Sequence, residues 1–213
     1  MSDTQTQNKL KDRADRKRQK RETRKSEIAA SALDALKELG YANTSLRDIA
    51  AQSDVSLGSL GYYFTDKSEL IAYCVQVYKK DFVARLRRVI EDPAGRDAVI
   101  ERFADSLARS VIEDRAAHRL WYDIRNQAQF DPVFRPVVAE IESWLIDVVA
   151  LAASAAGVRE TGSTTLGYAM IDGVFRYFIQ SSNTRDMGDH EDLAHQFSAV
   201  LHRVLDPEPG REG

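Results

Sequence analysis

The sequence predicts an all-α protein. Long segments carry apolar residues at helical spacing, and no segment of strand length alternates between apolar and polar residues. Glycine and proline, which interrupt helices, number only 11 and 5 among the 213 residues. We therefore expect long helices joined by short loops, with a small helical domain preceding a larger one.

The N-terminal end of the chain is strongly basic. The segment from Lys9 to Lys25 has ten basic and three acidic residues, whereas the chain from Lys67 onward has 18 basic and 23 acidic residues. The net charge of −3 by itself argues against nucleic-acid binding, but this asymmetry fits a DNA-facing end joined to an acidic remainder. A basic segment can also be merely solvated. Because residues 1–18 have almost no large apolar side chains, we expect them to be a disordered basic tail.

The first helix is predicted over about residues 21–39. Ile28, Ala32 and Leu36 form its apolar stripe, and Gly40 suits the position just after its end.

Two short helices and a tight turn are predicted next, in the segment 44–70, TSLRDIAAQSDVSLGSLGYYFTDKSEL. The first of them turns Ile49 inward and has Thr44 or Ser45 as its N-cap. Ser56 can cap the second, and either Thr65 or Asp66 can cap a longer helix that follows. This pattern is typical of a helix-turn-helix, whose second helix lies in a DNA major groove.

Part of this segment, IAAQSDVSLGSLGYYFTDKSEL, resembles the signature of the TetR family of transcriptional regulators, I-A-x-x-A-G-V-S-x-G-T-L-Y-x-Y-F-x-x-K-x-x-L. The matching residues are Ile49, Ala50, Val55, Ser56, Gly58, Leu60, Tyr63, Phe64, Lys67 and Leu70. The resemblance covers roughly the first third of the chain. It implies a three-helix helix-turn-helix DNA-binding domain over residues 19–66 and a helical ligand-binding and dimerisation domain over 67–206. A disordered tail is expected over 207–213.

Three residues depart from the family pattern. Ser53 and Asp54 replace the small Ala-Gly pair of the turn, and Asp54 adds a negative charge near the DNA face. Gly61 stands where the family usually has an aromatic residue that touches the phosphate backbone. It either reflects drift at an exposed position or lets the backbone approach DNA closely.

The expected DNA contacts divide into groove-facing and phosphate-facing residues. Those that face outward on the second helix of the motif are Ser56, Leu57, Gly58, Ser59, Gly61 and Tyr62. Leu57 could contact a thymine methyl group, and Ser59 could hydrogen-bond a base edge or a phosphate. Phosphate contacts are expected from Thr44, Arg47 and Lys67, and Tyr62 could donate its hydroxyl to a phosphate.

In the larger domain, helices are expected over about residues 67–90, 96–112, 115–128, 131–156, 163–181 and 190–205. Pro136 falls near the start of its helix and can kink it.

Aromatic residues recur at helical spacing in this domain, with polar residues close to them in sequence. For any one of them an ordinary core position is the alternative, but the resemblance implies an inducer pocket between the middle helices. The residues expected to line it are Phe82, Phe103, Trp121, Tyr122, Asn126, Trp144, Asp172 and Phe175. Asp172 and Arg176 leave the sign of the ligand's charge open.

The last two helices have apolar residues at near-helical spacing. In the family, this helix pair from each subunit forms a four-helix bundle at a two-fold axis; the alternative is packing within one chain. The expected interface residues are Leu166, Met170, Val174, Tyr177, Phe197, Val200 and Val204.

Other classes of protein find little support. The sequence has no glycine-rich phosphate loop, serine elbow or Cys–His nucleophile pattern, and HEDLAH spaces two histidines five apart rather than the four of a zinc protease. We therefore expect no enzyme, no catalytic residue, no metal and no cofactor. A single cysteine, Cys74, fits a reducing compartment, and no apolar run approaches membrane-spanning length. The protein is expected in the cytoplasm, without a membrane partner.

The sequence thus predicts a one-component transcriptional regulator, most simply a repressor. It would bind a palindromic double-stranded DNA operator as a homodimer and be released by a small-molecule inducer. The alternative is a ligand-independent DNA-binding protein of the same fold. A ligand that raises the melting temperature would distinguish the two.

Overall fold

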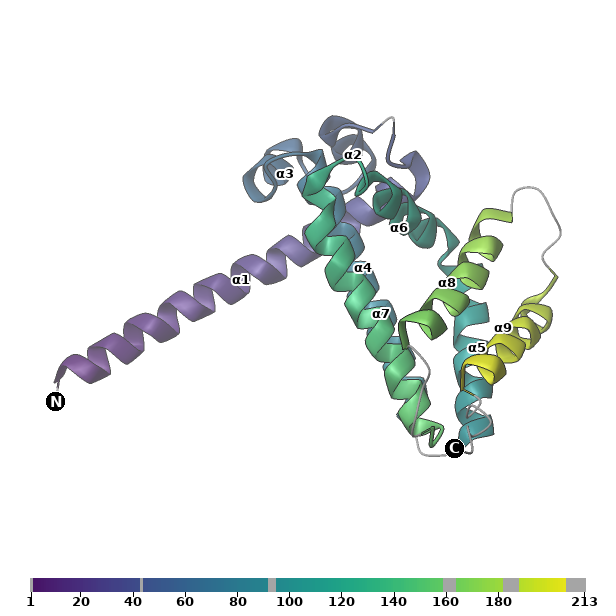
Figure 1. Ribbon diagram of the computed structural model, residues 1–213. Coiled ribbons are helices and arrows are strands. Elements are labelled where there is room, and N and C mark those ends of the chain that lie inside the picture. The colour runs from purple at the N-terminus through teal and green to yellow at the C-terminus, as the bar shows by residue number, and fades with distance from the viewer. Residues whose placement is uncertain (1, 43, 92–94, 159–163, 182–187, 206–213) are drawn as a thin grey trace. The chain divides into compact units, whose positions relative to one another are not determined.

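The computed structural model describes residues 2–42, 44–91, 95–158, 164–181 and 188–205 (Figure 1). Over these ranges it contains nine α-helices, one short 3-10 helix and no strand, which confirms the all-α prediction. The chain divides into two compact units, Met1–Val77 and Tyr78–Gly213. The division falls inside the fourth helix rather than before it. Among the described residues, no helix is long and apolar enough to cross a membrane.

The first unit consists of α1 (Ser2–Leu39), α2 (Leu46–Gln52), α3 (Leu57–Tyr63) and the first half of α4 (Lys67–Ile90). The prediction of a disordered tail over 1–18 is wrong for the described part, because α1 begins at Ser2 and extends well beyond α2 and α3 (Figure 1). This segment has no apolar stripe, but arginine, lysine and glutamine have high helix propensity. Ion pairs one turn apart, such as Arg18 to Asp15 at 3.4 Å, add local support.

The core of the first unit comes from the apolar stripes predicted for its helices. Ile28 and Leu36 of α1 are buried together with Ile49 of α2, Leu60 of α3 and Phe64. Each short helix thus contributes one large buried side chain, and its remaining faces stay available for other contacts.

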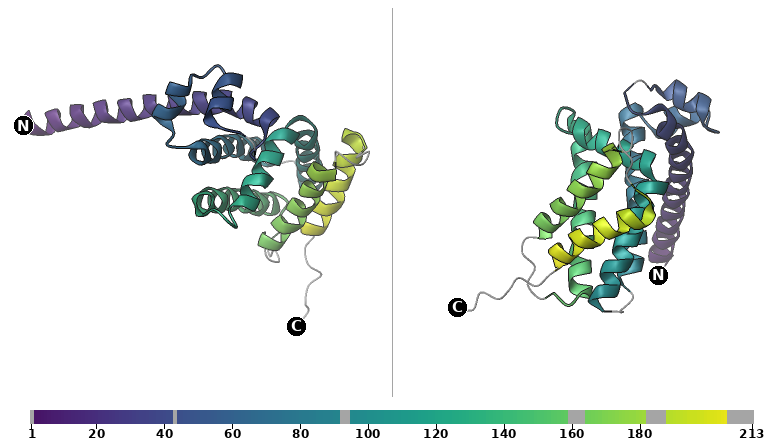
Figure 2. Two further views of the ribbon diagram at one scale, coloured as in Figure 1. Left: turned by 90° about the horizontal axis from the view of Figure 1, so that it is seen from above. Right: turned by 90° about the vertical axis from the view of Figure 1, so that its right-hand side faces the viewer.

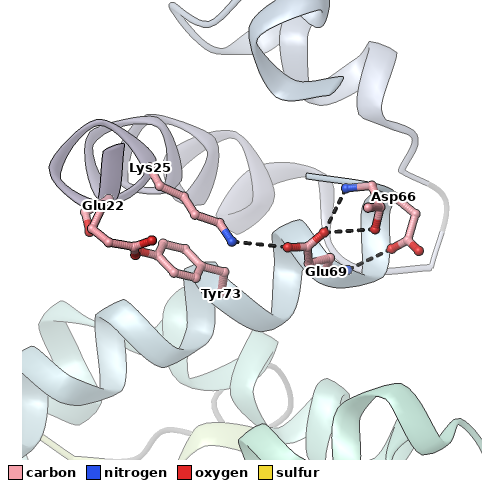
Figure 3. Close-up of polar contacts among 7 residues, drawn as sticks. Glu22, Lys25, Asp66, Glu69 and Tyr73 are labelled. Atoms are coloured by element: carbon pink, nitrogen blue, oxygen red, sulfur yellow. Dashed lines mark hydrogen bonds and ion pairs between the residues drawn. The ribbon is translucent and has the colours of Figure 1, made fainter. Parts of the chain in front are cut away.

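The start of α4 is fixed by a set of polar contacts (Figure 3). Asp66 caps the helix, since its Oδ1 accepts from the Glu69 N–H at 2.8 Å. Glu69 Oε2 accepts from the N–H and hydroxyl groups of Thr65, both at 2.8 Å, and its Oε1 accepts from Lys25 Nζ at 3.1 Å. The hydrogen bond from the Thr65 N–H is the main cause that lowers the pKa of Glu69. These contacts tie α4 to α1 directly after the helix-turn-helix.

The second unit consists of the rest of α4, α5 (Arg96–Glu113), α6 (Arg115–Gln127), the 3-10 helix η1 (Pro132–Phe134), α7 (Arg135–Ala155), α8 (Thr164–Ser181) and α9 (His190–Leu205). Helix α9 packs on α5 and α8, and α8 also packs on α7 and α6 (Figure 2). The helix predicted from residue 131 begins instead as η1, capped by Asp131, before α7 starts. Pro136 lies in the first turn of α7, where its missing N–H removes no helical hydrogen bond. The tail expected over 207–213 lies outside the described residues.

Candidate functional site

Two serine caps shape the helix-turn-helix. Ser45, not Thr44, caps α2: its Oγ accepts from the Asp48 N–H at 3.2 Å, while Asp48 Oδ2 accepts from the Ser45 N–H at 2.8 Å. Hydrogen bonds from Ser45 lower the pKa of the Asp48 carboxyl. Ser56 caps α3 by accepting from the Ser59 N–H at 3.1 Å. The caps fix where both short helices begin, which isolated seven-residue helices could not do by propensity alone.

The outward face of α3 has two exposed side chains and two glycines. Leu57 is 43% exposed and Tyr62 is 72% exposed, and Gly58 and Gly61 lie between them. A Cβ atom added to either glycine would meet nothing within 4 Å. Neither glycine is therefore required by packing within the unit. The face offers the apolar side chain of Leu57, the phenol of Tyr62 and accessible backbone, which suits close approach to a groove.

The remaining predicted DNA contacts differ in their availability. Arg47 is exposed on α2, and the Ser59 hydroxyl already accepts from Ser56 Oγ at 3.0 Å. Lys67 Nζ donates to the Tyr41 carbonyl at 3.2 Å and lies 4.8 Å from the Tyr41 ring centroid. One of its three ammonium donors is thus used to position the side chain.

The expectation that Thr44 contacts phosphate does not fit the structure. Thr44 is buried, and its hydroxyl donates to the Gly40 carbonyl at 2.5 Å. Its side chain thus packs against the residue that follows α1 rather than facing outward. The sequence left the cap of α2 open between Thr44 and Ser45, and the hydrogen bond that Ser45 accepts from the Asp48 N–H identifies Ser45 as the cap.

Helix α1 adds a basic surface to this unit. From Arg13 to Arg24 every residue is exposed, and the segment contains seven basic and two acidic residues. Sequence-independent attraction to the phosphate backbone needs such a concentration of positive charge on an accessible face.

The second unit contains a partly open cavity of about 40 Å³. Its walls come from α4, α5, α6, α7 and α8, and they are apolar except at a few positions. Five of the predicted ligand-binding residues line it: Phe82, Phe103, Tyr122, Asp172 and Phe175.

Trp121, Asn126 and Trp144 are absent from the cavity wall. Trp121 is fully buried, but it neighbours the cavity-lining Tyr122 in the helix and so points about 100° away from it. Asn126 and Trp144 are half-buried on α6 and α7. Adjacency in sequence therefore does not bring these three side chains to the cavity.

Sequence reasoning missed Lys79 of α4, which lines the cavity although it is only 2% exposed. Its Nζ lies 3.1 Å from His118 Nδ1. His118 Nε2 lies 2.8 Å from the Tyr78 hydroxyl and 2.7 Å from the Ser110 hydroxyl. Burial lowers the pKa of Lys79 to about 7 and lowers the pKa of His118 well below its usual value. A signal was present in the sequence, because Lys79 interrupts an apolar stripe between Val75 and Val83.

The second charged group at the cavity is already paired. Asp172 Oδ1 accepts from the Tyr122 hydroxyl at 2.9 Å, and its Oδ2 accepts from Arg125 at 2.5 Å. Arg125 also pairs with Glu142 through its Nε at 2.7 Å. Burial, and then the Asp172 charge, raises the pKa of the Tyr122 hydroxyl, so this phenol stays protonated and donates.

The predicted interface residues fall into two groups. On α8, Leu166 and Tyr177 are 61% and 51% exposed, and Met170 is also exposed. Val174, Val200 and Val204 are half-buried. The exposed members recur at near-helical spacing and form an apolar stripe along α8.

Phe197 is a correction to the predicted interface. It is fully buried inside the unit, with its ring centroid 5.9 Å from that of Phe175 and 5.6 Å from that of Phe178. The α8–α9 contact also depends on Gly167, since a Cβ there would lie 2.8 Å from Val204 Cγ1. Phe197 and Gly167 thus serve packing within one chain.

Comparison with known proteins gives a consistent result. The sequence profile described as "Bacterial regulatory proteins, tetR family" matches residues 28–74, from the second half of α1 into α4. The HTH-type transcriptional regulator BetI of Burkholderia cenocepacia is 25% identical over 191 residues, covering 85% of this chain and 95% of that protein.

Two further similar proteins have names that state an activity, repression in one and multidrug binding in the other. The HTH-type transcriptional repressor Rv3405c of Mycobacterium tuberculosis is 32% identical over 127 residues, covering 56% of this chain and 65% of that protein. The crystal structure of the multidrug binding protein EbrR, complexed with imidazole, has a TM-score of 0.63 and 25% identity. The structural match covers 89% of this chain and 98% of the EbrR chain.

Proposed function

Because the chain belongs to the TetR family of bacterial transcriptional regulators, we propose that it represses transcription by binding a palindromic operator as a homodimer. A small-molecule ligand would release it from the DNA. The observation that carries the DNA-binding part is the exposed face of α3, with Leu57, Tyr62 and two unpacked glycines. The relative named as a repressor supports the direction of regulation. We expect the protein to act in the cytoplasm, because the chromosomal DNA of a bacterium lies there.

A dimer follows from the way such helices read DNA. One seven-residue helix reaches only a few base pairs, so two of them, placed by a two-fold axis in successive major grooves roughly 34 Å apart, are needed for specificity. We assign the contact to the apolar stripe of α8. Leu166 and Tyr177 are large side chains with half or more of their surface exposed in one protomer, as is typical of an unformed helix-helix interface.

Release by a ligand would use the cavity of the second unit. A volume of about 40 Å³ holds a few waters, whereas pockets for drug-sized ligands measure roughly 300–1,000 Å³. A ligand must therefore move the lining helices apart. One of these is α4, which lines the cavity through Phe82 and begins at Lys67 directly after α3. A ligand that binds the widened form better than the DNA-bound form shifts the population away from DNA.

The DNA-binding part is tested by selection from a random duplex library with the full-length protein. We expect an enriched palindrome whose half-sites are one helical turn or a multiple apart. Lys67→Ala should weaken binding to all duplexes alike. Enrichment without two-fold symmetry would refute the dimeric arrangement.

The ligand part is tested by measuring operator affinity with compounds that raise the melting temperature. Coupling of about 1–3 kcal/mol, or roughly a 5- to 150-fold loss of operator affinity, is expected. A stabilising compound that leaves operator affinity unchanged would favour the ligand-independent protein of the same fold.

A further inference from the structure

Lys79 is a buried lysine whose charged form makes few hydrogen bonds in the described structure. An ammonium group has three donors and no acceptor. In the described structure, the polar partner of Lys79 Nζ is His118 Nδ1, and no carboxylate comes within the 4.0 Å of an ion pair. Buried ammonium groups are ordinarily paired with an anion, so this wall of the cavity is electrostatically incomplete.

Aromatic rings surround the rest of the ammonium group. Its Nζ lies 4.8 Å from the ring centroid of Phe82, 5.2 Å from that of Trp121 and 5.9 Å from that of Tyr78. Cation–π contacts favour the charged form but offer no lone pair to its N–H groups. Burial is the main cause that lowers the pKa of Lys79 to about 7, and the Asp172 charge only partly opposes it.

His118 positions the ammonium group but does not neutralise it. Burial is the main cause that lowers the pKa of His118, followed by the charges of Lys79 and Arg85, so its ring is neutral. Its Nε2 is held by the hydroxyls of Tyr78 and Ser110, and this leaves Nδ1 directed at Lys79. The imidazole thus holds the ammonium group in place without supplying a negative charge.

Asp172 does not supply the missing anion either. Both of its oxygens are occupied, one by the Tyr122 hydroxyl and the other by Arg125. A cationic ligand would have to compete with Arg125 for this carboxylate, whereas an anionic ligand needs only the donors of Lys79. Apart from the Tyr168 hydroxyl, the remaining wall is apolar and includes Leu86, Leu107, Leu145, Val148, Val149 and Ile171.

We propose that the ligand of this cavity is an organic anion, an apolar molecule with a single carboxylate that pairs with Lys79. This assignment rests on the proposed role of the cavity as the ligand site. The carboxylate would accept hydrogen bonds from the remaining N–H donors of the ammonium group. The apolar body of the ligand would widen the space between α5, α7 and α8.

Binding should also move a proton. At a pH of about 8 most of the native protein holds Lys79 neutral, and an approaching carboxylate restores its charge. Each bound carboxylate should therefore take up about one proton from the buffer.

The test is isothermal titration calorimetry on the full-length protein. The probes are octanoate and phenylpropionate, each compared with the matching primary alcohol and primary amine. We expect each carboxylate to bind at least about tenfold more tightly than its alcohol or amine. Lys79→Met should remove this preference, whereas Lys80→Met, at the exposed neighbouring position, should keep it. Proton uptake is obtained on the wild-type protein from titrations in phosphate and in Tris, so it does not depend on how well a variant folds.

The proposal is overturned if neither carboxylate binds, if the alcohols or amines bind as tightly, or if carboxylate binding takes up no proton. Equal carboxylate affinity in Lys79→Met would overturn it as well. Operator affinity is measured in parallel. A carboxylate that binds through Lys79 but leaves operator affinity unchanged would establish the anion site and refute release from DNA instead.

Discussion

Replacing Lys79 with methionine should change how the stability of the protein depends on pH. The pKa of this lysine falls from 10.5 to about 7 on folding, mainly because the side chain is buried. Between these two values the unfolded chain holds a proton that the native protein has released. Stability must therefore rise with pH across this window, and below a pH of about 7 the native state carries the full cost of a buried charge.

The magnitude follows from the size of the window. One proton contributes about 1.4 kcal/mol per pH unit where only the unfolded chain binds it. From a pH of about 6 to about 9, the wild-type protein should thus gain roughly 2–3 kcal/mol relative to Lys79→Met. The charged groups that act on Lys79 are Asp172, Arg125 and Asp114, and all are common to both proteins. The neighbouring His118 stays neutral across this range because its own pKa is lowered.

The assay is urea unfolding at fixed protein concentration, followed by circular dichroism at several pH values. Urea is preferred to guanidinium because it leaves the ionic strength unchanged, and a fixed concentration removes the effect of subunit association. Lys80→Met serves as the control for removing an exposed lysine. If the difference in unfolding free energy between wild type and Lys79→Met is independent of pH, the buried-charge reasoning is refuted.

Three further substitutions test other parts of the structure. Tyr177→Asp places a charge on the apolar stripe of α8 and should give a monomer of full helical content by light scattering; an unchanged dimer would place the interface elsewhere. Phe197→Ala removes a buried ring and should lower the unfolding free energy by about 3–5 kcal/mol in chemical denaturation, whereas a loss of dimer without loss of stability would return Phe197 to the interface. Leu57→Ser should alter base preference at one or two operator positions in a binding selection while leaving non-specific affinity nearly constant; a uniform loss at all sequences would argue against groove contact.

Most of the fold was predictable because each helix buries one apolar stripe. The bounds of α4 and α9 agree closely with prediction, since Asp66 and Asp189 cap the two helices and apolar residues recur along both. The first part of α1 was not predictable in this way, because it has no apolar stripe to detect. Local propensity and ion pairs such as Arg18 with Asp15 act there without a core.

The candidate site was less predictable than the fold. An apolar residue at helical spacing can face the core, a cavity or a partner, and sequence periodicity does not separate these cases. Phe82 lines the cavity, Phe197 is core, and Tyr177 is exposed, although the three are equivalent by pattern. Lys79 was missed for the opposite reason, since lysines are rarely buried and a charged residue is usually assigned to the surface.

The open space around Gly58 and Gly61 bears on how the operator specificity of this regulator can diverge. A Cβ atom added at either position meets nothing within 4 Å in the protein, and replacing a helical glycine with alanine favours the helix by about 1 kcal/mol. New side chains can therefore arise on the outward face of α3 without weakening the fold that carries them. After gene duplication, two copies could acquire different operators while retaining the same core and the same cavity.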